Sequence, residues 1–425
     1  MRISKFFLTL LLSLILHALH AQVLLNNFAI TGVTIIDANH RTALPRQTVL
    51  ITQKIISDIF NDGSKSIPDS FNVLRMDGKY LLPGLIDAHV HMATDPSDVD
   101  NRENTLDVLQ RMLYSGITSV RDMAGDGRTL ASLSRDAFTG DIISPDIYYS
   151  SLMAGPKLFT DPRVAASSKG YIPGNAPFMK AITDTTNLML AVAEAKGMGA
   201  TGIKLYAYLS APLVDKIVAE ANKQGIIVWG HAWLDDAKPS DLVKAGVSPL
   251  SHSPLMIYEK MDSVPSYWKN GHTHYTSIGD SVPDLSSLFE LMKAHHTILD
   301  ATILTYKLWG EEDTTIRYDY EIAKQITIQA YKAGVTIDAG TDDDQKAFVQ
   351  KEMELLVKDA GLEPIDAIIA GTLNGAKALH IDNSRGTISV GKIADILILD
   401  KNPLQDIENL ESVDLVIKNG KIFKK

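Results

Sequence analysis

The chain has 425 residues, of which 45% are hydrophobic and 22% charged, and these values are ordinary for a globular protein with a large core. A formal net charge of −10, with no basic run beyond Lys424–Lys425, argues against nucleic acid and anionic membrane surfaces as partners. Cysteine is absent, which excludes disulfides, thiolate metal ligands and cysteine nucleophiles.

Residues 1–21 have the pattern of a secretory signal peptide. Arg2 and Lys5 precede an apolar run from Phe6 to Leu16, and small residues lead to a predicted cleavage point after Ala21. Cleavage would leave a secreted or periplasmic protein without stable membrane insertion. The alternative is an uncleaved N-terminal anchor. No other stretch approaches the roughly 20 apolar residues that a transmembrane helix needs.

Both ends of the mature chain are rich in β-forming residues. Near the N-terminus these are Ala29–Asp37 and Thr48–Ile59, and near the C-terminus Ile393–Asp400 and Val413–Phe423. Asn419-Gly420 is a strong hairpin turn signal. We predict one small β-sandwich domain formed by both termini, with residues 22–80 plus 381–425.

The middle of the chain, residues 81–380, alternates between β-rich runs and helical patterns, and it predicts a (β/α)₈ TIM barrel. The competing architecture is a doubly wound open sheet. That fold normally places a glycine-rich phosphate loop after its first strand, and residues 87–91 do not form one. The expected helices include Leu213–Gln224, Leu285–His295 and Tyr318–Ala333. The expected strands are Leu82–His91, Ile117–Met123, Ile147–Ala154, Gly202–Ala207, Ile226–Ala232, Pro249–Ser253, Thr297–Ile303 and Thr336–Asp342.

Polar residues gather at the carboxyl ends of these strands, which is where barrel enzymes place their chemistry. His89 and His91 are two apart on one strand, so both rings point to the same face and suit a transition metal. Burying a charge or a bare imidazole there is costly unless the group is paired or binds a metal. The candidate metal ligands are His89, His91, Lys204, His231, His252 and Asp342.

Other polar residues are weaker candidates. Tyr206 lies two residues beyond Lys204 and is expected to contact a substrate or pack in the core; Asp122 is a candidate supporting residue. The pair His272 and His274 is assigned to a solvated loop. The segments 156–177 and 258–283 lack periodicity, and such long loops commonly cover an active site. The candidates for binding a substrate carboxylate are Arg121 and Arg163.

The residues Pro83–His91 closely resemble the first-strand signature of the amidohydrolase superfamily. The Gly-Ile-Lys of strand four, the histidines of strands five and six and the Gly-Thr-Asp of strand eight resemble its remaining ligands in order. The segments Gly116–Asp122 and Gly391–Ile396 are also similar to family segments. Within the superfamily, the chain looks most like the prolidase-like and imidazolonepropionase-related group.

The resemblance implies a binuclear site with two divalent metal ions, expected to be zinc. In this arrangement Lys204 reacts with CO₂ and bridges the metals as a carbamate, while His89, His91 and Asp342 hold one metal and the remaining two histidines the other. A hydroxide bridging the metals attacks a carbonyl, and Asp342 acts as the catalytic acid and base. The alternative for Lys204 is a structural lysine paired with an acid.

The expected activity is hydrolysis of amide bonds in small molecules, either Xaa-Pro-like dipeptides or N-acyl amino acids. The strand-four lysine argues against ring opening of imidazolonepropionate, whose enzymes lack it as a ligand. Cyclic amides or lactones are alternative substrates, and a non-catalytic ligand-binding barrel is the alternative class. The sequence leaves the metal identity and the oligomeric state open.

Overall fold

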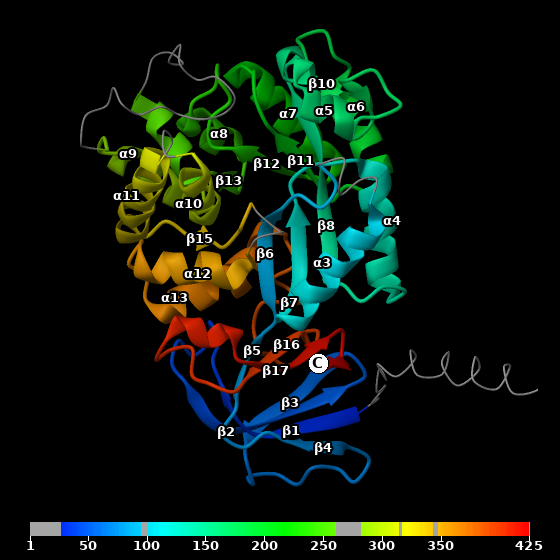
Figure 1. Cartoon of the computed structure of the whole chain (residues 1–425), viewed down its shortest axis with the longest axis vertical. Coiled ribbons are helices and arrows are strands. Elements are labelled where there is room, and N and C mark those ends of the chain that lie inside the picture. The colour runs from blue at the N-terminus through cyan, green and yellow to red at the C-terminus, as the bar shows by residue number, and fades with distance from the viewer. Residues whose placement is uncertain (1–26, 95–100, 261–281, 314–316, 343–346, 425) are drawn as a thin grey trace, which may run out of the picture.

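The computed structural model describes residues 27–94, 101–260, 282–313, 317–342 and 347–424, and it contains two separate β-sheets (Figure 1). The predicted signal peptide lies outside these residues and stays a prediction. Within the described ranges, no helix combines the length and the apolar character needed to cross a membrane.

The smaller sheet joins the two ends of the chain. It has the order β18-β17-β16-β5-β1-β2-β3, with β4 paired to β1. Strands from both ends share one apolar core that contains Ile30, Ile51, Ile398 and Ile417. The predicted small β domain from both termini is confirmed, and its hydrogen bonding is that of one continuous sheet. Its strands are β1 (Asn27–Ile35), β2 (Leu44–Thr52), β3 (Ile55–Asn61), β4 (Asn72–Arg75), β5 (Tyr80–Pro83), β16 (Ile396–Leu399), β17 (Val413–Lys418) and β18 (Lys421–Phe423).

The larger sheet is the predicted barrel. Eight parallel strands follow the order β6-β7-β8-β11-β12-β13-β14-β15, and each coincides with one of the eight expected runs. Their bounds are β6 (Leu85–Val90), β7 (Ile117–Asp122), β8 (Asp146–Ala154), β11 (Gly202–Leu205), β12 (Ile227–His231), β13 (Leu250–Ser251), β14 (Leu299–Asp300) and β15 (Ile337–Asp338).

Hydrogen bonds between the first and last strands bring the barrel to closure. The Ala88 amide donates to the Ala339 carbonyl at 2.9 Å, and the Asp342 amide donates to the His89 carbonyl at 2.8 Å. These bonds join β6 to the segment that follows β15. Closure therefore places the ends of the first and the eighth strands side by side, and the open-sheet alternative is excluded.

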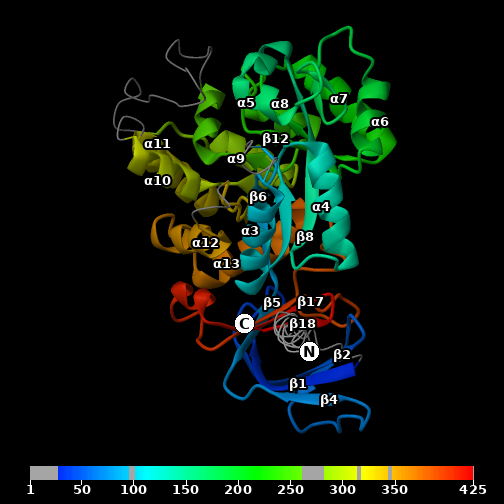
Figure 2. The same cartoon turned by 45° about the vertical axis from the view of Figure 1, so that its right-hand side comes forward.

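Helices surround the barrel (Figure 2). The three expected helices are confirmed as α7 (Ala211–Gln224), α9 (Ser286–Ala294) and α11 (Arg317–Ala333). The segment 156–177 contains short elements, namely η1 (Pro156–Thr160), α5 and β9 (Asn175–Ala176), followed by β10 (Met179–Ala181). They are too short to show a periodic pattern. The α-helices are α3 (Arg102–Tyr114), α4 (Gly127–Thr139), α5 (Pro162–Ser167), α6 (Leu188–Gly197), α7 (Ala211–Gln224), α8 (Pro239–Ala245), α9 (Ser286–Ala294), α10 (Ile303–Glu312), α11 (Arg317–Ala333), α12 (Val349–Lys358), α13 (Pro364–Ile369) and α14 (Gly375–Ala378); η2 (Ser253–Lys260) and η6 (Ile407–Glu411) are 3₁₀-helices and η5 (Ala370–Asn374) a π-helix.

The small sheet packs against the amino-terminal ends of the barrel strands. Leu397 and Leu399 of β16 belong to the same buried apolar cluster as Leu85 and Ile117, which begin β6 and β7. The barrel strands therefore start at the small sheet and run away from it (Figure 1). Their carboxyl ends, with the candidate ligands, lie on the far side of the barrel.

Candidate metal centre

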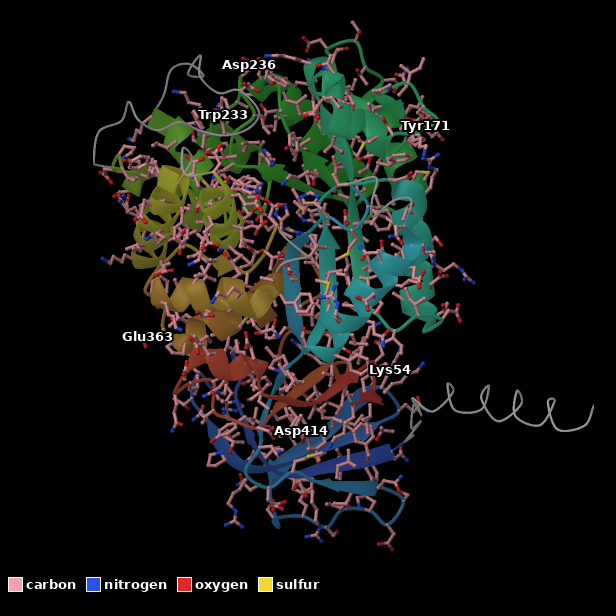
Figure 3. The ribbon with its side chains drawn as sticks, in the orientation of Figure 1. Lys54, Tyr171, Trp233, Asp236, Glu363 and Asp414 are labelled. Atoms are coloured by element: carbon pink, nitrogen blue, oxygen red, sulfur yellow. The ribbon has the colours of Figure 1, made fainter. Side chains whose placement is uncertain are left out.

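The six candidate ligands lie in, or just after, five of the barrel strands. His89 lies in β6 and His91 just after it, Lys204 lies in β11, and His231 ends β12. His252 follows β13, and Asp342 lies four residues beyond the end of β15. Trp233 and Asp236, which follow β12, mark this end of the molecule, opposite Lys54 and Asp414 near the small sheet (Figure 3).

The carboxylate of Asp342 lies close to three histidine rings. Its Oδ1 lies 3.3 Å from Nε2 of His89 and 3.0 Å from Nε2 of His91. Its Oδ2 lies 3.9 Å from Nδ1 of His252. Among the described residues, His89, His252 and Asp342 have ligand atoms all within 4.8 Å of one another, a group that could hold a metal ion.

His231 and His252 form the other side of the cluster. Their ring centroids are 4.5 Å apart with the rings perpendicular, and His252 is 5.1 Å from His89. Nδ1 of His252 is 2.9 Å from the Thr302 hydroxyl, so its Nε2 is left for another partner. The structure thus places four histidine rings and one carboxylate around a common space.

Lys204 is buried in the barrel with 1% of its surface exposed. Its Nζ donates to the Ser251 hydroxyl at 3.2 Å, and within the described residues it forms no ion pair with an acid. Burial lowers the pKa of Lys204 to about 7, with Arg121 adding to the shift and Asp300 opposing it. A buried lysine with its pKa lowered to about 7 and no ion pair with an acid among the described residues fits the structural alternative poorly, and it offers the neutral amine that addition of CO₂ requires.

The protonation states suit a divalent cation. Burial lowers the pKa of His252 to about 3 and also lowers the pKa values of His89 and His231, so these rings are neutral at pH 7. Burial also disfavours a charge on His91, but the hydrogen bond to Asp342, the negative charges of Asp342 and Asp122 and the bond to the Ala124 carbonyl together outweigh it and raise the pKa of His91 to about 9. A bound cation would take the place of that proton, because neutral imidazoles and an ionised carboxylate converge there.

Several residues at this rim adopt left-handed backbone conformations that side chains rarely tolerate. His252 has a φ of 76° and Asp342 a φ of 51°, and Thr302, Tyr208 and Asp235 have values from 48° to 66°. Such strain costs on the order of 1–3 kcal/mol per residue and clusters at functional sites. Its concentration at these strand ends supports a functional role for this end of the barrel.

The residues expected to contact a substrate differ in where the structure places them. The Tyr206 ring lies 4.1 Å from the His231 ring and is partly exposed, so it borders the cluster. Arg121 is fully buried beneath the site, with its guanidinium bonded to Asp300 and to the Ala88 carbonyl. The suggestion that Arg121 binds a substrate carboxylate is therefore wrong. The side chain of Arg163 and the pair His272 and His274 lie outside the described residues.

Sequence reasoning missed the residues that support the ligands. Asp300 accepts from Nδ1 of His89 at 2.7 Å, and Ser251 and Thr302 bond Lys204 and His252. Asp300 is an acidic residue inside the expected strand Thr297–Ile303, as Lys204 is a charged residue inside its strand, and this signal could have identified it. Asp122, the candidate supporting residue, accepts from the Met92 amide at 2.6 Å and so fixes the chain just after His91.

These features define a (β/α)₈ barrel with a histidine–aspartate cluster at the carboxyl ends of its strands. The model of the amidohydrolase family matches residues 80–423, so this chain belongs to the amidohydrolase family. It is thus a hydrolase of carbon–nitrogen bonds, and its solved relatives include prolidase-like members.

Individual relatives agree with this assignment. The ochratoxinase of Aspergillus niger is 26% identical over 395 residues, which cover 81% of this chain and 75% of that protein. A Xaa-Pro dipeptidase structure with bound methionine in its active site is 25% identical, with a TM-score of 0.76, and the match covers 94% of this chain and all of that one. The ochratoxinase structure has a TM-score of 0.75 at 22% identity, covers 94% of this chain and 96% of its own, and supports the fold alone.

Proposed function

We propose that this protein is a metal-dependent amidohydrolase with a binuclear site formed by His89, His91, His231, His252, Asp342 and Lys204. The observation that carries the proposal is the convergence of the His89, His91 and His252 imidazoles on the Asp342 carboxylate, beside a buried lysine that forms no ion pair with an acid among the described residues. Without a cation, such a set of buried polar groups is costly, whereas two divalent metals would satisfy it.

Each side chain has a defined task in this proposal. His89, His91 and Asp342 hold one cation, and His231 and His252 hold the second. Lys204, as a carbamate, would be a ligand shared by the two cations. When bound, the two cations, with zinc the expected identity, polarise the scissile carbonyl and make hydroxide available near neutral pH. Asp342 accepts the proton of the attacking water and delivers it to the leaving nitrogen, because its carboxylate faces both sides of the cluster.

The proposed substrates are Xaa-Pro-like dipeptides or N-acyl amino acids. Similarity to a Xaa-Pro dipeptidase over nearly the whole chain supports dipeptides. Tyr206 borders the His231 side of the cluster, and this position supports a contact with the substrate there. Tyr306, whose ring lies 6.2 Å from the His252 ring, is a second aromatic side chain beside the cluster. An aromatic border favours a substrate with an apolar or ring-shaped side chain next to the scissile bond.

A substrate panel tests this function. The mature protein, loaded with Zn²⁺ and bicarbonate, is incubated with Xaa-Pro and other dipeptides, N-acyl amino acids, cyclic amides and lactones. We expect turnover of a linear amide that Asp342→Asn reduces at least about 10³-fold, since one change removes a metal ligand and the proton carrier. Asp184→Asn, which alters an exposed carboxylate paired with the exposed Lys216, is the matched control.

The outcomes separate the candidate functions. Turnover restricted to lactones or cyclic amides would replace the substrate class while keeping the hydrolytic site. No turnover across the panel with two metals bound would contradict the amidohydrolase assignment for linear substrates and favour a ligand-binding barrel. Equal turnover in Asp342→Asn and in the control would contradict the role of Asp342.

A further inference from the structure

Asp300 is a fully buried carboxylate at the end of β14 on which three donors converge. Its Oδ2 accepts from Nδ1 of His89 at 2.7 Å, from the Ser251 hydroxyl at 2.8 Å and from Nη2 of Arg121 at 3.0 Å. His89 and Lys204, which bonds Ser251, belong to different parts of the proposed binuclear site. One carboxylate therefore connects a terminal ligand with the bridging ligand.

We propose that Asp300 is a positioning residue that fixes the tautomer of His89 and, through Ser251, the orientation of the Lys204 carbamate. This inference rests on the proposed function, since it concerns the same metal centre. Asp300 itself reaches no substrate, because it lies below the ligands and is closed off from solvent.

The effect on His89 follows from the direction of one hydrogen bond. An ionised carboxylate can only accept, so the proton of the neutral imidazole must lie on Nδ1, facing Asp300. The lone pair is then on Nε2, the atom that faces Asp342 at 3.3 Å. Asp300 thus keeps His89 in the one tautomer that can coordinate a cation at the cluster.

The effect on Lys204 passes through the hydroxyl of Ser251. Its hydrogen points to Asp300, so its lone pairs face Nζ of Lys204 at 3.2 Å. In carbamate formation, the neutral amine nitrogen forms a bond to the carbon of CO₂, one C=O electron pair moves to oxygen, and one N–H proton leaves to solvent. The product keeps one N–H. That N–H donates to Ser251 and so fixes the plane of the carbamate and the directions of its two oxygens.

Arg121 and Gly340 hold Asp300 in place. The Arg121 guanidinium is fully buried, bonds the Ala88 carbonyl as well as Asp300, and lies 5.0 Å from the Trp229 ring centroid. Its positive charge pairs with the Asp300 carboxylate at 3.0 Å. Gly340 leaves room for the other carboxylate oxygen, because a Cβ at this position would lie 2.6 Å from Oδ1 of Asp300.

The test measures metal and carbamate directly and does not use substrate turnover. Zinc affinity is measured by competition with a chromophoric chelator, and the carbamate by ¹³C NMR after loading with ¹³C-bicarbonate. We expect Asp300→Asn to weaken zinc binding about 10–100-fold and to reduce the carbamate signal, because an amide can direct a donor hydrogen at His89. Asp366→Asn, which alters a partly buried carboxylate in α13 that is not part of the cluster, should match the wild type in zinc affinity and carbamate signal.

A second pair of variants tests the hydrogen bonds from Asp300 through Ser251 to Lys204 separately. This test does not require that Asp300→Asn folds. Ser251→Ala should lose most of the carbamate signal at low bicarbonate and regain it at high bicarbonate, whereas Ser251→Thr, which keeps a hydroxyl, should retain the signal. Wild-type zinc affinity together with an intact carbamate signal in both Asp300→Asn and Ser251→Ala would overturn the positioning role alone. A wild-type protein that binds no zinc would contradict the proposed function as well.

Discussion

At the scale of single residues, the candidate ligands show how burial sets charge. Burial keeps His252 neutral, whereas the neighbouring Asp342 carboxylate keeps His91 protonated in the absence of a metal. Burial likewise disfavours the charge of Asp342 itself, but the surrounding histidines hold its pKa below the ordinary value. The ligands are therefore already close together before a cation binds, and binding of a cation requires loss of the His91 proton.

The depressed pKa of His252 predicts a pH dependence for the metal-free protein. The unfolded ring binds a proton below about pH 6.5, but the folded ring does so only near pH 3. Between these values the unfolded state holds the extra proton, so this ring lowers the free energy of unfolding as the pH falls, by about 1.4 kcal/mol per pH unit. His252→Gln should remove that contribution.

Urea unfolding in the presence of EDTA, repeated from pH 7 to pH 4, measures this slope. His295→Gln is the matched control, because His295 is an exposed histidine at the end of α9. We expect the His252→Gln curve to be flatter than the wild-type curve and the His295→Gln curve to follow the wild type. Parallel curves for all three proteins would show that His252 is not buried in its neutral form.

At the scale of elements, β6 and the segment after β15 can approach closely because Gly340 has no side chain. A Cβ on Gly340 would lie 2.6 Å from the Cβ of His89 and 3.0 Å from its backbone nitrogen. Both His89 and Asp342 lie in these two segments. The spacing of the ligands is thus set by how tightly the first and eighth strands pack.

Gly340→Ala should therefore destabilise the fold by about 1–3 kcal/mol, as overpacking does, and weaken zinc binding by separating Asp342 from the histidines. The measurements are urea unfolding and chelator competition. Gly197→Ala is the control, since a Cβ there meets nothing within 4 Å and alanine suits the end of α6. Unchanged zinc affinity in Gly340→Ala would show that the two strands have room to adjust.

At the scale of the whole molecule, a buried cluster of ion pairs connects the barrel with the small sheet. Asp146 begins β8, and its carboxylate pairs with Arg385 at 2.7 Å and with Lys418 of β17 at 2.6 Å. Arg385 also pairs with Asp395 at 2.7 Å. Two cations and two carboxylates balance each other, so removal of one carboxylate leaves an uncompensated charge in the interior.

Asp146→Asn should lower the free energy of unfolding by about 3–5 kcal/mol, the cost of breaking a buried ion pair from one side. Thermal and urea unfolding measure the change. Asp184→Asn removes one partner of an exposed pair with Lys216 and should change stability by less than about 1 kcal/mol. A similar, small change in both variants would mean that water reaches the Asp146 cluster.

The sequence by itself determined the order and the positions of the elements. The eight barrel strands appear as β-rich runs, and α7, α9 and α11 appear as helical patterns, because side-chain periodicity is a local property. The spacing of His89 and His91 places both rings on one face for the same reason. The strand-end positions of the other proposed ligands could also be read from the chain, and the family resemblance implied how the ligands divide between two metals.

Only the tertiary structure decided which polar groups meet. His89 and Asp300 are 211 residues apart, and Lys204 and Ser251 are 47 apart, so no local pattern links them. Arg121 looked available to a substrate, yet barrel closure buries it beneath the ligands. Closure also joins the first strand to the eighth and gathers the strand ends into one cluster. Contacts of this kind depend on the path of the whole chain, because each partner is positioned by a different strand.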